Sequence, residues 1–148
     1  MSGWRIMLVL WMTLIFLASS GYLSPWMSAD GTVEVFGFLN YIVRKLTHFG
    51  EFAILTYLWL RSIWTEPDRL KACLGWSMVF SVLYAVSDEV HQCYVPQRQG
   101  IWTDVIFDAA GALAAGWALG WVGRRERGGL RRRVLGPQSL QIGAVDKI

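Results

Sequence analysis

Four long apolar stretches occupy most of the first 122 residues of this 148-residue chain, and they limit the folds that it can adopt. They cover about residues 4–20, 38–63, 72–87 and 101–122. A helix needs about 20 mostly apolar residues to cross the hydrocarbon core of a membrane, which is about 30 Å thick. No stretch shows the sustained alternation of apolar and polar residues that is typical of a membrane β-barrel. The pattern therefore predicts an all-α bundle of four transmembrane helices.

The composition favours a membrane protein over a soluble domain. Hydrophobic residues make up 54% of the chain and charged residues 17%, whereas soluble domains average about 45–50% and about 25%. A soluble fold of this size would have to leave many of the 9 tryptophan rings exposed to water. The same figures exclude an intrinsically disordered chain, because such chains are poor in aromatic residues and rich in net charge.

The positive charges indicate how the bundle is oriented. Most of the 14 lysines and arginines precede the first stretch, join the second to the third, or follow the fourth, and only Arg44, Lys45 and Arg98 fall on the other side. Because Lys and Arg stay in the cytoplasm, both termini are predicted to be cytoplasmic. Residues 1–122 would form the transmembrane domain. Residues 123–148 would form a basic, disordered cytoplasmic tail that anchors the topology and binds no nucleic acid.

The first stretch has an alternative interpretation as a secretory signal. A short basic start, an apolar run and the small residues at 18–21 are also typical of a signal with a cleavage site. We favour a retained helix, because an even number of spans keeps both basic ends on one side of the membrane.

Small residues recur at a spacing of four along the fourth stretch, at Ala112, Gly116 and Gly120. Small residues at this spacing let two helix backbones approach closely in lipid. This face is predicted to pack against another helix of the bundle or against a second copy of the chain in a homodimer.

Polar and ionisable residues recur at helical spacing in the predicted extracytoplasmic half of three helices. Residues three or four apart share one face of a helix, and charges within membrane spans are costly and usually functional. We predict that three polar faces meet in one cavity, over which Arg98 could fold back from its loop. The residues concerned are Lys45, His48, Glu51, Asp88, His91, Gln92, Asp104 and Asp108.

Several binding roles are open for this set. The network could simply hold the helices together, although interhelical polar contacts in membranes average only about 0.6 kcal/mol. His48, Glu51 and Asp88 could hold a divalent metal, although no established metal-binding motif is present. Lys45 and Arg98 could instead bind a phosphate, while the carboxylates take hydroxyls or amines. That combination would suit the headgroup of a membrane lipid or glycolipid of the cell envelope.

Two functions other than binding, catalysis and transport, are also open. In a hydrolase or transferase, His48 would be the general base, and Glu51 and Asp88 its catalytic partners. In a proton-linked carrier, Asp104 and Asp108 would relay protons. The residues expected to bind the substrate are Lys45, Glu89, Gln92, Arg98, Asp104 and Asp108.

Three segments of the chain resemble the VanZ-like family of small bacterial membrane proteins. Residues 44–52 contain Lys45-x-x-His48-Phe49, residues 87–98 contain Asp88-Glu89-x-x-Gln92-x-x-x-Pro96-x-Arg98, and residues 103–108 precede Gly111 and Gly116. Residues 15–20 also resemble the end of the family's first helix, which argues for a retained span.

The resemblance implies a four-helix, multi-pass protein of the bacterial cytoplasmic membrane. It also implies a link to glycopeptide resistance, because the founding member of the family is associated with teicoplanin resistance. The motif positions that carry over are Lys45, His48, Glu51, Asp88, Glu89, Gln92, Arg98 and Asp104. This chain departs from the family at Gln97, where Gly is frequent, and at Asp108, where Asn is common.

Overall fold

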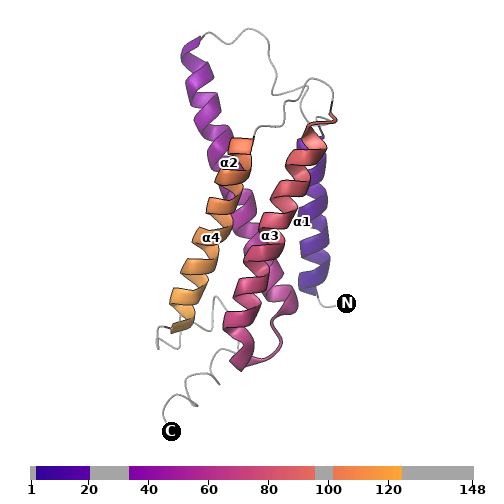
Figure 1. Ribbon diagram of the computed structural model, residues 1–148, viewed down its shortest axis with the longest axis vertical. Helices are drawn as coiled ribbons and strands as arrows, with labels where there is room; N and C mark the ends of the chain where they lie inside the picture. Colours follow the sequence, from indigo (N-terminus) through magenta and orange to yellow (C-terminus); the bar gives the residue numbers. More distant parts are fainter. Residues whose placement is uncertain (1–2, 21–33, 96–101, 125–148) are drawn as a thin grey trace.

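The computed structural model describes residues 3–20, 34–95 and 102–124, and the regular secondary structure in this part of the chain is entirely helical (Figure 1). No strand occurs among these residues, so the predicted all-α class with four long helices is confirmed. The elements are α1 (Gly3–Ser19), α2 (Glu34–Ile63), the 3-10 turn η2 (Pro67–Arg69), α3 (Leu70–Gln92) and α4 (Trp102–Arg124).

The helix ends differ from the predicted ones by about a turn. α2 begins at Glu34 rather than at residue 38, and α3 runs over residues 70–92 rather than 72–87. The extension of α3 matters most, because it places Asp88 and Gln92 on one continuous helix. α4 continues to Arg124, and the tail predicted beyond residue 122 lies otherwise outside the described residues, so the division into domain and tail stays a prediction.

The four helices alternate in direction, as Figure 1 shows. α1 and α3 run toward the upper end of that view, and α2 and α4 run toward the lower end, where η2 also lies. The start of α1 and the end of α4 are therefore at the same end of the bundle. This arrangement agrees with the prediction that both ends of the chain lie on one side of a membrane, while the cytoplasmic assignment of that side stays a prediction.

Two of the described helices, α3 and α4, are long and apolar enough to cross a membrane. α1 is also apolar but has 17 residues, and α2 has 30 residues but carries four of its charged or histidine side chains within one stretch, residues 44–51. Large apolar side chains cover the outside of the bundle, with Leu10 63% and Trp117 69% exposed. Such a surface suits lipid better than water. The fold is thus consistent with a membrane protein, and a four-span topology stays a prediction.

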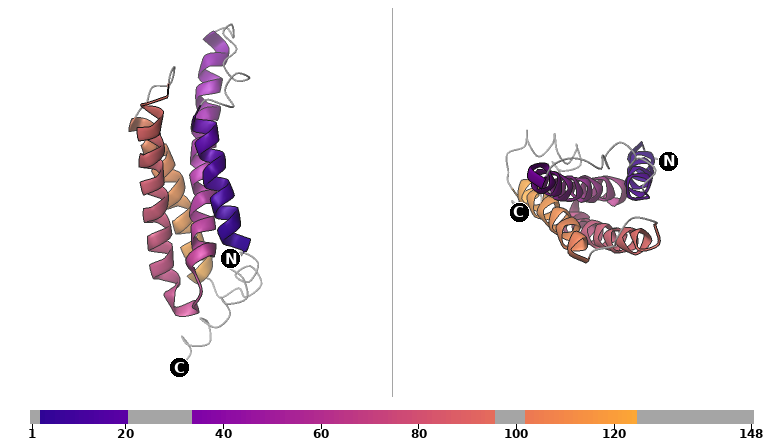
Figure 2. Two further views of the ribbon diagram at one scale, coloured as in Figure 1. Left: turned by 90° about the vertical axis from the view of Figure 1, so that its right-hand side faces the viewer. Right: turned by 90° about the horizontal axis from the view of Figure 1, so that it is seen from above.

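The helices form two layers, one made of α1 and α2 and the other of α3 and α4 (Figure 2). α2 and α4 share the largest contact between elements, whereas α1 packs mainly on α2 and touches α3 only slightly. The two edges of the bundle therefore differ, because α2 and α4 pack closely at one edge while α1 and α3 do not at the other.

Glycines allow the close packing of α4. A Cβ atom at Gly111 would overlap the backbone carbonyl of Phe49 in α2, so the two helix backbones touch at this level. A Cβ atom at Gly116 would overlap the side chain of Met78 in α3. The predicted face of Ala112, Gly116 and Gly120 thus packs within the chain, the first of our two alternatives. The homodimer stays a prediction, and one that these contacts do not favour.

An apolar core fills the lower and middle parts of the bundle. Phe52, Leu55 and Ala85 are fully buried in it, and Leu8 and Ile15 of α1 complete this core from the side of α2. The polar side chains buried at this depth are hydroxyls, and one of them joins the layers through a 2.9 Å hydrogen bond from Thr56 Oγ1 to Ser81 Oγ. The buried charged side chains lie in the upper half, where the candidate site is.

Candidate functional site

Charged and amide side chains from three helices are buried together with a serine of α1 in the upper half of the bundle. Six of them are almost inaccessible to solvent: Gln92 and Asp104 are each 1% exposed, and Lys45, Asp88, Glu89 and Asp108 at most 7%. Charged residues are rarely this buried unless they are paired or functional. We call the following set the polar cluster: Ser19, Lys45, His48, Glu51, Asp88, Glu89, Gln92, Asp104 and Asp108.

The first part of the polar cluster joins α2 to the start of α4. The ammonium group of Lys45 forms an ion pair with Asp104, and Arg44 Nη2 lies 3.4 Å from the second oxygen of the same carboxylate. Asp104 belongs to the first turn of α4, where the helix dipole also favours a negative charge. Both of these cations are therefore directed to one carboxylate. This contact is the one expected if the network holds the helices together, and a role of Lys45 in binding a phosphate stays a prediction.

The second part of the polar cluster lies one helical turn deeper. His48 Nδ1 lies 3.2 Å from Asp108 Oδ1, and the two side chains are 12% and 2% exposed. Asp108 comes one turn before Gly111, where the backbones of α2 and α4 touch, so the close packing brings the imidazole and the carboxylate together. Glu51 is half-buried and interacts electrostatically with His48, Asp108 and Asp88. The direct partner of His48 is thus Asp108, rather than Glu51 or Asp88 as the sequence suggested.

The third part of the polar cluster joins α1 to the end of α3. Ser19 Oγ donates a 2.6 Å hydrogen bond to Asp88 Oδ1, and Gln92 Nε2 donates a 2.9 Å hydrogen bond to Asp88 Oδ2. Both oxygens of this buried carboxylate are therefore satisfied. The carbonyl oxygen of Gln92, Oε1, is also buried, and no group in the described part of the chain donates to it.

Among the described residues of the polar cluster, carboxylates outnumber cations. Electrostatic interactions link four carboxylates, Glu51, Asp88, Asp104 and Asp108, whereas Lys45 is the one permanent cation of the set and Arg44 approaches from the rim with a side chain 45% exposed. Gln92 adds a carbonyl acceptor to this set. The polar cluster therefore presents more hydrogen-bond acceptors than donors, and it would bind a group that carries hydrogen-bond donors, positive charge or both.

A metal ion does not fit these residues well. Across residues 3–20, 34–95 and 102–124, no group of three or more His, Cys, Asp or Glu side chains converges in a way that could hold one. His48, Glu51 and Asp88, the ligands considered from the sequence, interact electrostatically but do not form a coordination set. Arg98, predicted to cover the cavity, lies outside the described residues.

A comparison with protein-family models identifies the chain. The model described as VanZ/LLP1 matches residues 4–123, which include nearly all of the four described helices. The chain belongs to the VanZ/LLP1 family. The resemblance inferred from the motifs around His48, Asp88 and Asp104 is thereby confirmed. Searches of curated proteins and of solved structures each found no significant match.

The main residue that the sequence analysis missed is Ser19. It lies in the segment 15–20, which resembles the end of the first helix of VanZ-like proteins, but its small side chain was interpreted only as part of a signal-like pattern. A serine at the end of an apolar stretch carries no spacing signal of its own. Its contact with Asp88 shows that α1 contributes a polar atom to the site.

His91 also behaves differently from its helical neighbours. The spacing placed it on the face of Asp88, but its ring stacks on Phe16 of α1, with the centroids 4.5 Å apart and the planes at 28°. This contact holds the upper part of α1 against α3 next to the polar cluster.

Proposed function

We propose that the polar cluster binds the headgroup of a membrane lipid or glycolipid of the cell envelope, through hydrogen-bond donors on that headgroup. The observation that carries the proposal is the carbonyl oxygen of Gln92, which is buried next to Asp88 without a donor from the described chain. Leaving a buried acceptor unpaired costs about 1–3 kcal/mol. A hydroxyl or ammonium group of a ligand would recover that cost.

The membrane is the natural source of such a ligand. The outside of the bundle is apolar, whereas the polar cluster lies inside its upper half, so a molecule with an apolar body and a polar head matches both environments. The excess of carboxylates favours headgroups with an ammonium group or several hydroxyls over a bare phosphate. Glycopeptide tolerance, which the VanZ-like resemblance implies, would be a physiological consequence of holding such a lipid.

A second function, a hydrolase or transferase acting on a lipid-linked phosphate or sugar, is favoured by the contact between His48 and Asp108. A carboxylate at one imidazole nitrogen fixes the ring and leaves the other nitrogen to accept a proton. On a bound headgroup, His48 would then act as a general base. The proton-linked carrier is not favoured, because the polar side chains buried below the cluster in the described helices are hydroxyls rather than ionisable groups.

The test is the lipid content of the protein purified from cells in a mild detergent. We expect lipids with ammonium or polyhydroxyl headgroups to be enriched with the wild-type protein and lost with Gln92→Leu, which removes the acceptor, together with the donor to Asp88, but keeps similar bulk. Glu66→Gln is the matched control, because Glu66 is exposed and its ion pair with Arg69 lies on the surface. Equal enrichment with Gln92→Leu would refute the proposal.

The same experiment separates binding from catalysis. If the protein only binds, His48→Ala co-purifies the same intact lipid as the wild type, with weaker retention. If it is an enzyme, cells with the wild-type protein contain an altered headgroup that is absent from cells with His48→Ala, while the variant still retains the unaltered lipid.

A further inference from the structure

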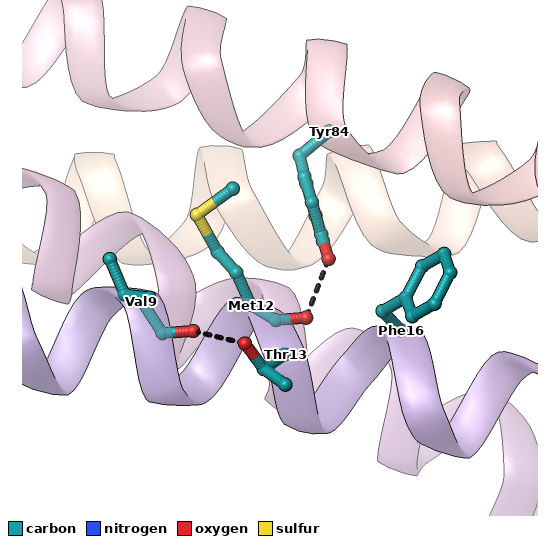
Figure 3. Close-up of a pocket in the computed structure, with 5 residues that line it drawn as sticks. All are labelled: Val9, Met12, Thr13, Phe16 and Tyr84. Atoms are coloured by element: carbon teal, nitrogen blue, oxygen red, sulfur yellow. Dashed lines mark hydrogen bonds between the residues drawn. The ribbon is translucent and has the colours of Figure 1, made fainter.

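A shallow apolar groove opens on the edge of the bundle where α1 and α3 face each other. Its volume is about 330 Å³, and it is lined by Val9, Met12, Thr13 and Phe16 of α1 and by Tyr84 of α3 (Figure 3). The α1 residues recur at the spacing of one helix face. α1 touches α3 only slightly, so this face is not covered by the neighbouring helix.

The groove offers no free polar group to an occupant. Its two side-chain hydroxyls are both engaged within the protein, as Figure 3 shows. Tyr84 Oη donates a 2.6 Å hydrogen bond to the Met12 carbonyl, and Thr13 Oγ1 donates a 2.9 Å hydrogen bond to the Val9 carbonyl. With its polar atoms satisfied, the groove suits an apolar chain rather than a peptide or a sugar.

The upper end of the groove adjoins the polar cluster. Phe16 lies one helical turn below Ser19 on α1, and Tyr84 lies one turn below Asp88 on α3. Ser19 and Asp88 are hydrogen-bonded to each other, so the groove and the polar cluster lie along the same interface between α1 and α3. One helical turn is about 5.4 Å, which is short enough for the head and the chain of one lipid to occupy both places.

We propose that this groove holds one acyl chain of the lipid whose headgroup binds to the polar cluster, an inference that rests on the function proposed above. The lipid enters sideways from the membrane between α1 and α3. The opposite edge of the bundle does not offer this route, because α2 and α4 are in backbone contact at Gly111.

Whether a lipid chain occupies the groove depends on headgroup binding at the polar cluster. Membrane lipid chains are as apolar as the groove, so a chain gains little free energy by leaving the bilayer. Selective occupation must therefore be driven by the headgroup. We therefore expect a substitution in the polar cluster to remove the bound lipid chain from the groove, even though the substituted residue lies a helical turn or more away.

The test uses the full chain in lipid nanodiscs that contain one of two phospholipids with the same photoreactive group in the acyl chain. One has an ethanolamine headgroup and the other is phosphatidic acid, which has a phosphate without an amine. After irradiation, mass spectrometry maps the crosslinked residues. We expect the ethanolamine lipid to crosslink to the groove residues more than to Leu10, which lies outside the groove and is more exposed, at 63%, than Val9 or Phe16.

Two tryptophan substitutions provide the matched comparison. Thr13→Trp fills the groove from an exposed position of α1 and should reduce groove crosslinks to the level at Leu10. Leu10→Trp adds the same bulk on the lipid-facing side and should leave them unchanged. Gln92→Leu should also remove the excess crosslinks in the groove.

The outcomes separate the two proposals. Crosslinks spread evenly over all exposed faces, while Gln92-dependent lipid still co-purifies, would overturn the groove and leave the proposed function intact. Groove crosslinks that are equal for both headgroups and unaffected by Gln92→Leu would overturn the proposed function. Loss of crosslinks with Leu10→Trp as well as with Thr13→Trp would also refute binding in the groove, since a large side chain anywhere on α1 would then be enough to remove the crosslinks.

Discussion

The ion pair between Lys45 and Asp104 allows the sharpest test of how the polar cluster is assembled. The two side chains are only 8% and 2% exposed, so substituting Asp104 with Asn leaves a buried ammonium group without its counter-charge. Removing one partner of a buried pair costs about 3–5 kcal/mol. Arg44 adds little, because its side chain is 45% exposed and such pairs contribute about 0–1 kcal/mol.

We therefore expect Asp104→Asn to lower the free energy of unfolding by about 3 kcal/mol or slightly more, since the amide still accepts a hydrogen bond from the ammonium group. Denaturant unfolding in detergent micelles measures this value. The matched control is Glu66→Gln, which breaks a pair whose two side chains are 68% and 56% exposed and should change the stability by at most about 1 kcal/mol.

The double substitution Lys45→Met with Asp104→Leu completes the test. Apolar residues of similar volume often replace a buried ion pair at no cost or with a gain in stability. The double variant should therefore be more stable than Asp104→Asn alone. If Asp104→Asn costs no more than Glu66→Gln, the ammonium group is not buried against Asp104, and our account of the first part of the polar cluster is wrong.

Three further predictions concern the packing of the helices, and each is measured as the same free energy of unfolding. Gly111→Ala should destabilise by about 1–3 kcal/mol because its Cβ atom overlaps a backbone carbonyl of α2, whereas Gly50→Ala, with nothing within 4 Å, should be neutral or stabilise by up to about 1 kcal/mol. Equal effects at the two glycines would contradict the close contact of α2 with α4. Ser19→Ala should cost about 1–3 kcal/mol by removing a donor to a buried carboxylate, while Ser20→Ala, whose hydroxyl is exposed, should cost less than about 0.5 kcal/mol. Tyr84→Phe should cost about 1 kcal/mol and speed amide hydrogen exchange in α1, and unchanged exchange would show that its hydrogen bond does not tether this helix.

The sequence was enough to predict the helices and their polar faces. Apolar runs of span length indicate where each helix lies, and a spacing of three or four assigns residues such as Lys45 and His48 to one face. The ends were less certain, because hydrophobicity stops before the helix does when its last turn is polar. α3 continues through Asp88 to Gln92 for this reason.

The pairing within the polar cluster could not be predicted in the same way. Which carboxylate meets which cation depends on the vertical register of α2 against α4, and that register is set by the backbone contact at Gly111. Spacing within one helix carries no information about this register. The sequence therefore identified Asp104 and Asp108 as candidates but not as the separate partners of Lys45 and His48.

The contribution of α1 was the least visible from the sequence. Its residues are apolar or small, so nothing distinguishes the face that packs on α2 from the face that lines the groove. Only the packed structure shows that Ser19 reaches Asp88 and that Phe16 stacks on His91.

A binding titration tests the central claim most directly. Short-chain phospholipids that differ only in the headgroup, ethanolamine against bare phosphate, are titrated into the detergent-solubilised protein by isothermal calorimetry. Our account predicts tighter binding of the ethanolamine lipid, with the preference lost in Gln92→Leu and kept in Glu66→Gln. Tighter or equal binding of the bare phosphate by the wild-type protein would contradict a site whose buried acceptors outnumber its donors.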